Sequence, residues 1–289
     1  MTPISHTLEL SGVGRSLHCK SAGSGRDIVL IHGALTTHTD WMGDLFEAFA
    51  NRGRVFAVDR PGHGRSARPR FKASPFEQAQ QIREGLQKLG VERPLLVGHS
   101  FGALVASAWA SAYPGEVSGL LLISPIAFHE FRVLEHSVFA PRSLPVFGPV
   151  LAQMAAPTLD VAMLPLVQKI MFAPHDPPAD WLDRYPYDQI LTEGATVAEG
   201  EDAAAIFPGS PIGLVNYMAV TAPVRMLTGE RDHVVYPIRH AKRLACLLPE
   251  AELMVRLDVG HMLHHTASDS LFAVVDELLL KPDATQAPS

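Results

Sequence analysis

The residue with the clearest chemical potential in this sequence is a serine between two glycines. Ser100 lies in the pentapeptide Gly98-His99-Ser100-Phe101-Gly102, which follows an apolar run and precedes a run of small residues. Between a strand and a helix, such a pentapeptide forms a sharp turn that projects the serine hydroxyl from the carboxyl end of a sheet. Side chains at the glycine positions would clash in so tight a turn. The pattern therefore predicts that Ser100 is a nucleophile.

The elements that position Ser100 follow from the alternation of apolar and amphipathic segments. The pattern predicts strands at 6–10, 17–20, 27–33, 54–59, 94–98, 118–124, 223–229 and 252–258. It predicts helices at 40–51, 75–89, 100–113, 237–247 and 268–280, with Asp40 and Ser74 as N-caps. The first two strands suit an antiparallel pair, whereas strands alternating with helices imply a mainly parallel sheet.

Residues 125–221 interrupt this alternation. Prolines are frequent in this segment, and short apolar helical patches such as LAQMAA and LPLVQKIMF lie between them. Such a segment is a poor continuation of a parallel sheet, because proline cannot donate to a strand ladder. We therefore expect residues 1–124 and 222–281 to form a core domain and 125–221 to form a helical cap over Ser100. The tail, 282–289, is expected to be disordered.

Further motifs make the chain resemble the α/β-hydrolase superfamily. They are HGA at 32–34, DRPGHGRS at 59–66, GERDHVVYP at 229–237 and VGH at 259–261, in addition to the GHSFG pentapeptide. The order of elements over residues 6–281 is similar as well. The resemblance implies an α/β-hydrolase fold: a mostly parallel, eight-stranded sheet with helices on both faces and a helical cap insertion.

The resemblance also implies which groups activate Ser100. A serine hydroxyl is a weak nucleophile near neutral pH and needs a base that is itself oriented by a third group. In the order of serine, acid and histidine that the superfamily uses, the acid is Asp232 and the base is His261. The nearest competitors are Glu230 for the acid, and His264 and His265 for the base.

The same resemblance places an oxyanion hole at two backbone amides. One is the N–H of Phe101, and the other is the N–H of Ala34, with Leu35 as its alternative. Leu35, His99 and Phe128 are expected to contact the substrate. Other polar residues of the loops are expected to hold these loops by hydrogen bonds: His32, Asp59, Arg60 and His63.

A serine, histidine and aspartate beside an oxyanion hole catalyse acyl transfer through an acyl-enzyme. The expected substrate is a small carboxylic ester, or a thioester, with an apolar acyl or alcohol group. The chemistry requires no metal and no organic cofactor, and no cluster with metal-ligand spacing is evident in the sequence. Because Ser100 replaces the aspartate of haloalkane dehalogenases and epoxide hydrolases, the resemblance argues against both of these activities.

Three alternatives stay open at this point. Carbon–carbon bond hydrolases of the superfamily use a serine, although they usually have asparagine where this chain has His99. Cofactor-free haloperoxidases share the same triad. A receptor that binds a small molecule without turnover is an alternative of another class, because a fold alone does not determine function.

Composition, charge and the apolar segments bear on the partners and the location of the protein. The 289-residue chain has a formal net charge of −6 and 19% charged residues, which argues against binding to nucleic acid. We expect its two cysteines to be free thiols in a reducing compartment. No signal peptide or spanning segment is evident, so we expect a cytoplasmic monomer or homodimer without stable membrane insertion.

Overall fold

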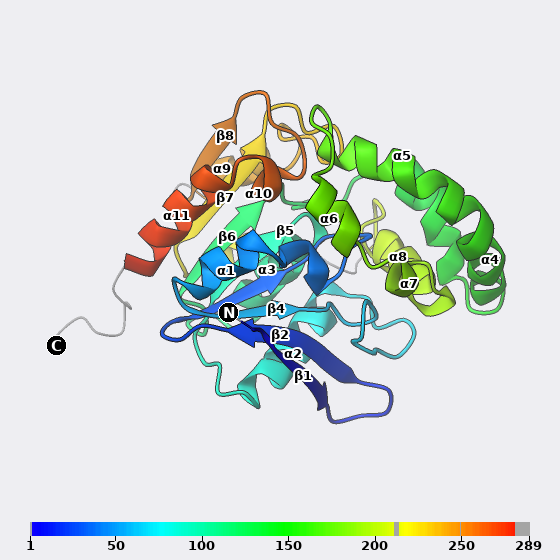
Figure 1. The fold of residues 1–289 in the computed structure, drawn as a ribbon, viewed down its shortest axis with the longest axis horizontal. Coiled ribbons are helices and arrows are strands. Elements are labelled where there is room, and N and C mark those ends of the chain that lie inside the picture. Colours follow the sequence, from blue (N-terminus) through cyan, green and yellow to red (C-terminus); the bar gives the residue numbers. More distant parts are fainter. Residues whose placement is uncertain (1, 211–213, 249, 281–289) are drawn as a thin grey trace.

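A single twisted sheet organises the protein. The computed structural model describes residues 2–210, 214–248 and 250–280, so the predicted disordered tail lies outside the described residues. The strands are β1 (Ile4–Glu9), β2 (Ser16–Ala22), β3 (Asp27–Ile31), β4 (Arg54–Val58), β5 (Leu95–His99), β6 (Gly119–Ile123), β7 (Val224–Gly229) and β8 (Glu252–Arg256). Their order is β1-β2-β4-β3-β5-β6-β7-β8 (Figure 1). The pairs β1–β2 and β2–β4 are antiparallel and the others parallel, which confirms the predicted fold class.

The strand order creates the place for a site. From β3 the chain moves to β4 on one side, and then returns to place β5 on the other side of β3. The loops that leave β3 and β5 therefore diverge at the carboxyl edge of the sheet. Ligands of open α/β sheets bind at such a switch point. The HGA loop and the Ser100 turn are these two loops, and residues of both line the cavity between them.

Helices cover both faces of the sheet and bury two apolar cores. One face packs against α1 (Asp44–Ala50) and α11 (Ser268–Leu280) through Phe49 and Val275. The other face packs against α2 (Pro75–Gln87), α3 (Phe101–Ala112) and α9 (Ala241–Leu247). As predicted, α2 begins with proline after an N-cap at Ser74, whose hydroxyl accepts from the N–H of Phe76.

The predicted start of the first helix, 40–51, was wrong. A short 3₁₀ helix, η1 (His38–Trp41), precedes α1, and Asp40 is buried inside η1 instead of capping a helix. Its carboxylate accepts from Trp181 Nε1 at 2.9 Å. It also contacts Nε2 of His264 at 3.0 Å and Nε2 of His265 at 2.9 Å. A carboxylate with three hydrogen-bond donors is stable in the protein interior. Asp40 therefore lies inside the protein instead of facing solvent as an N-cap.

Between β6 and β7, the described residues form helices and loops without a strand. The helices are η2 (Glu135–Phe139), η3 (Ala140–Ser143), α4 (Phe147–Ala155), η4 (Ala156–Asp160), α5 (Val161–Phe172), α6 (Ala179–Arg184), α7 (Tyr187–Ile190), α8 (Glu193–Ala205) and η5 (Tyr217–Ala219). The elements α4 to α8 gather on one side of the sheet, at the right of Figure 1. We call residues 125–221 the cap.

The segments α4, η4 and α5 run on as one helix, Phe147–Phe172, which is long and apolar enough to cross a membrane by length and composition. In the sequence, a spanning segment is expected to be a run of about 18 uncharged apolar residues, and this helix differs because it contains Asp160 and Lys169. The absence of stable membrane insertion stays a prediction. Large apolar side chains are exposed along and just before it: Leu144, Val146, Phe147, Val150, Leu151, Met154, Leu159, Val161, Met163, Leu166 and Ile170. The prolines at 149, 157 and 165 do not break this helix.

Candidate active site

The turn between β5 and α3 has the strained geometry that its sequence requires. Ser100 has φ 55° and ψ −117°, a conformation that few residues with a side chain adopt. A Cβ on Gly102 would lie 2.3 Å from the carbonyl oxygen of Ile31, and one on Gly98 would lie 2.5 Å from that of Gly102. Both glycines are therefore required by close backbone packing, which holds Ser100 at the start of a helix.

The structure brings His261 and Asp232 together. His261 Nδ1 lies 2.8 Å from Asp232 Oδ2, and both residues are buried. The other oxygen, Oδ1, accepts from the N–H groups of Val234 at 2.9 Å and Val235 at 2.7 Å. These bonds orient the carboxylate, which in turn fixes the ring so that Nε2 is the nitrogen free to act as a base.

The competing residues lie elsewhere. Glu230 is exposed to solvent. His264 and His265 contact Asp40 instead of Asp232. Burial lowers the pKa of His264 to about 4, so this ring is neutral at pH 7. The geometry therefore selects Asp232 and His261 from the candidates for the acid and the base.

The predicted oxyanion donors lie beside Ser100. Ala34, Leu35 and Phe101 line the same cavity as Ser100 and His261. The N–H of Leu35 already donates to Glu199 Oε1 at 2.6 Å. No hydrogen bond described for residues 2–210, 214–248 and 250–280 uses the N–H of Ala34. Because the N–H of Leu35 is already used, the geometry favours the N–H of Ala34 as the second donor to an oxyanion.

The cavity at Ser100 has a volume of about 100 Å³. The core contributes the predicted site residues, and the cap contributes mainly apolar walls: Leu134, Phe139, Val167, Ile170, Met171, Ala203 and Ile206. Arg132, Glu135, Glu199 and Asp202 are its charged cap residues. Arg132 Nε donates to Glu135 Oε1 at 2.7 Å, so the guanidinium that lines the cavity is already paired with a carboxylate.

Two of the predicted substrate contacts need comment. His99 lines the cavity but is buried; its Nε2 lies 3.2 Å from the carbonyl oxygen of His261. Burial, with the neighbouring His264 and His261, holds the pKa of His99 well below its ordinary value. The prediction for Phe128 was wrong, because this ring lies outside the cavity. It packs near Tyr217, with the Arg243 guanidinium 4.1 Å from the ring centroid.

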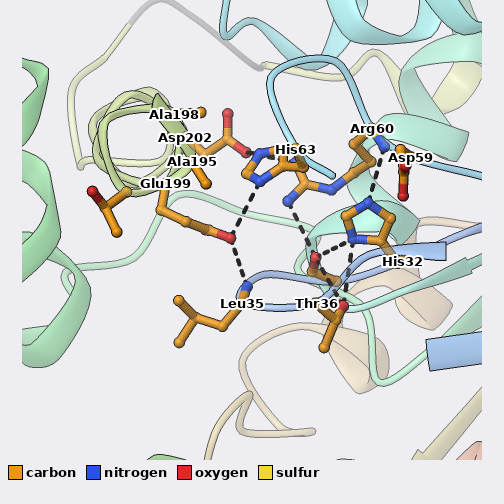
Figure 2. A network of polar contacts seen from close by, with 12 residues as sticks. His32, Leu35, Thr36, Asp59, Arg60, His63, Ala195, Ala198, Glu199 and Asp202 are labelled. Carbon is orange, nitrogen blue, oxygen red and sulfur yellow. Dashed lines mark hydrogen bonds and ion pairs between the residues drawn. The ribbon is translucent and has the colours of Figure 1, made fainter. Parts of the chain in front are cut away.

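A buried charge network joins the cap to the loops of the core, as Figure 2 shows. Asp202 of α8 accepts from Arg60 Nη1 at 2.5 Å and Arg68 Nη1 at 2.8 Å, and contacts His63 Nε2 at 2.9 Å. Burial works to raise the pKa of Asp202, but Arg68 and Arg60 outweigh it and hold the pKa well below its ordinary value. Arg60 Nη2 also donates to the carbonyl of Gly33 at 3.1 Å, so this network reaches the HGA loop, which carries the predicted oxyanion donor Ala34.

Glu199 was not predicted from the sequence, yet it contacts that loop directly. Besides the N–H of Leu35, its Oε1 lies 3.4 Å from His63 Nδ1. Tyr185 of the cap donates its hydroxyl to the carbonyl of Leu35 at 2.5 Å. The cap thus satisfies both backbone polar groups of Leu35.

Two groups of side chains among the described residues have the composition of metal ligands: His18, His38 and Asp59, and Asp40, His264 and His265. The sequence spacing indicated neither group, because in each the fold brings together side chains that lie far apart in the chain. In both groups the aspartate directly contacts histidine nitrogens, at 2.8 Å in the first and 3.0 and 2.9 Å in the second. These hydrogen bonds account for the buried carboxylates without a metal ion.

A second cavity of about 80 Å³ lies within the cap. It shares Leu35, Leu134, Phe139 and Val167 with the cavity at Ser100. Its other lining residues are Val138, Leu159, Asp160, Met163, Leu164, Ile190, Leu191 and Thr196. Apart from Asp160 and Thr196, the side chains that line this second cavity are apolar.

One curated relative resembles the chain over most of its length, and another resembles about a third of it. An uncharacterized protein of Mycobacterium tuberculosis is 30% identical over 272 residues, covering 89% of this chain and 76% of that protein. Human 1-acylglycerol-3-phosphate O-acyltransferase ABHD5 is 35% identical over 107 residues, which cover 36% of this chain and 30% of that protein.

Solved structures share the fold. Epoxide hydrolase CorEH has a TM-score of 0.78 at 18% identity, covering 96% of this chain and 98% of its own. A Bacillus anthracis bromoperoxidase has a TM-score of 0.77 at 17% identity, covering 96% of this chain and 100% of its own. A putative aryl esterase of Burkholderia cenocepacia has a TM-score of 0.73 at 19% identity, with the same coverage of the two chains. The family model described as alpha/beta hydrolase fold matches residues 28–268, and the chain belongs to this family.

Proposed function

We propose that the protein is a serine hydrolase that cleaves small carboxylic esters, or thioesters, with an apolar acyl or alcohol group. The observation that carries this proposal is the convergence on one cavity of Ser100, the His261–Asp232 pair and the amides of Ala34 and Phe101. The cap walls of that cavity are mainly apolar, and its guanidinium, that of Arg132, is already paired. Neutral substrates therefore fit it better than carboxylates do.

The reaction follows from this arrangement. Ser100 Oγ attacks the ester carbonyl while His261 takes the hydroxyl proton, and the two amides stabilise the oxyanion. The intermediate collapses, and His261 gives the proton to the leaving alcohol, which leaves an acyl-enzyme on Ser100. Water then repeats the sequence and releases the acid. The carboxylate of Asp232, which contacts Nδ1 of His261, stabilises the protonated ring.

A labelling experiment tests this function. The protein should react with a fluorophosphonate probe and hydrolyse p-nitrophenyl butyrate, whereas Ser100→Ala should do neither. Ser107→Ala is the matched control, because Ser107 is a buried serine of α3 whose hydroxyl donates to the carbonyl of Ala103. A Ser100→Ala protein that keeps more than a few per cent of either signal would exclude this nucleophile.

The alternatives give different results in the same experiment. A haloperoxidase would also be labelled, but would brominate a phenol when given peroxide and bromide. A carbon–carbon bond hydrolase would be labelled and cleave a vinylogous diketone faster than an ester. A receptor would bind without labelling or turnover.

A further inference from the structure

We propose that the second cavity of the cap is a subsite for a hydrocarbon chain of the substrate, so that the preferred esters carry a medium or long unbranched chain. This inference rests on the proposed function, and it adds a substrate class and a binding site. The subsite lies between η2, η4, α5, α7 and the beginning of α8.

The two cavities are adjacent. Four residues line both of them, and one of these, Leu35, directly follows the proposed oxyanion donor Ala34. A chain that extends from a carbonyl held at Ser100 therefore needs to pass only these four side chains: Leu35, Leu134, Phe139 and Val167. All four are apolar, so the passage offers no polar group that would lose hydration.

The polar groups of the second cavity are already paired. The carboxylate of Asp160 accepts two hydrogen bonds from the Arg142 guanidinium, at 2.6 and 2.7 Å. The hydroxyl of Thr196 donates to the carbonyl of Thr192 at 2.9 Å. The other lining residues are aliphatic or aromatic. A polar ligand would find no partner there, whereas a methylene chain loses nothing on entry.

The two cavities thus divide the substrate by chemistry. The catalytic side chains line the first cavity, where the ester group must lie, whereas the only charged group of the second cavity, the Asp160 carboxylate, is paired with Arg142 and leaves room for hydrocarbon alone. Its outer wall includes Leu159 and Met163, which are 49% and 37% exposed. A bulky substitution at either position therefore changes the lining of the cavity at a residue that is not part of the buried core.

Chain-length profiles of blocked variants test the subsite. For the unmodified protein, kcat/KM of p-nitrophenyl esters should rise severalfold with every two carbons added to the acyl chain, from acetate to decanoate. Met163→Trp, and independently Leu159→Trp, should lower kcat/KM for decanoate about tenfold and leave acetate within about twofold. Leu166→Trp is the control, because Leu166 is an exposed residue of α5 that lies outside both cavities. A matching series of alkyl butyrates shows whether the acyl or the alcohol chain occupies the site.

A binding measurement separates this proposal from the proposed function. In the Ser100→Ala background, n-decanol should raise the melting temperature, and Met163→Trp should abolish the increase while Leu166→Trp keeps it. If the protein hydrolyses no ester, the proposed function fails and the decanol shift still decides the subsite. Equal losses for acetate and decanoate, or unchanged profiles and decanol binding in both blocked variants, would overturn the subsite.

Discussion

Replacement of Asp202 by asparagine tests how firmly the cap is joined to the core. In the structure this carboxylate balances two guanidinium groups, of which Arg60 is fully buried and Arg68 is 2% exposed. The asparagine side chain would keep the shape of the aspartate but lose the charge. Its amide oxygen could still accept one hydrogen bond from Arg60 or Arg68, while its N–H₂ group would face the remaining donors.

The loss of stability expected for Asp202→Asn follows from the burial of the carboxylate and of the guanidinium groups that it contacts. Removing one partner of a buried ion pair costs about 3–5 kcal/mol, because the other charge stays buried without compensation. At about 2–4 °C per kcal/mol for chains approaching this length, the melting temperature of Asp202→Asn should fall by roughly 6–20 °C. Arg68 keeps its contact with Glu201 at 3.2 Å, which places the expected loss toward the lower end of that range.

Thermal unfolding followed by circular dichroism measures the effect. Glu193→Gln is a suitable control, because Glu193 is an exposed acid in the first turn of the same helix, where its charge contributes only about 0.3–1 kcal/mol. A melting temperature of Asp202→Asn within about 2 °C of that control would refute the reasoning, since it would mean that water already solvates these guanidinium groups.

Three further results are expected. Asp232→Asn should lower kcat about 10⁴-fold, as the same change does in serine proteases, while Glu230→Gln leaves turnover within about twofold. Burial works to raise the pKa of Asp59, but hydrogen bonds from His38 outweigh it and hold the pKa at about 2. Urea titrations should therefore show that ionised Asp59 contributes to the free energy of unfolding. This contribution should be complete above about pH 5 and lost as the pH falls through about 2, and the Asp59→Asn protein should not show this part of the pH dependence. Ellman's reagent should titrate one thiol in the native protein and two after unfolding, because Cys246 is exposed while Cys19 is buried with a pKa raised to about 12.

Local patterns predicted the core of the fold because each strand and helix of the sheet carries its own signal. The turn at Ser100 is the clearest case: a continuous apolar run, two glycines and a run of small residues specify strand, turn and helix within one short segment. The same holds for α2, where Ser74 and Pro75 mark the start. Parallel pairing then follows from the alternation of these elements.

The contacts between distant segments could not be predicted in this way. Asp40 precedes an apolar run, as an N-cap does, yet tertiary contacts with Trp181 and two histidines decide its place. In the sequence, Glu199 resembles any acid on a solvated helix. It gains its partner, the N–H of Leu35, only because α8 packs against the HGA loop. Phe128 was predicted to contact the substrate as one of the apolar residues of the cap, but it packs against Arg243 and Tyr217.

The hydrogen bonds of Leu35 with the cap bear on how this protein could have been assembled in evolution. A lid that had been added to a finished enzyme would be expected to leave the older catalytic loop self-sufficient. Here Glu199 and Tyr185 supply the partners for the N–H and the carbonyl of Leu35, and Asp202 supplies the counter-charge for Arg60 beneath it. Excision of residues 125–221 would expose these groups together. The cap and this loop therefore supply each other's polar partners, so an exchange of the cap between relatives would need the matching loop to be exchanged with it.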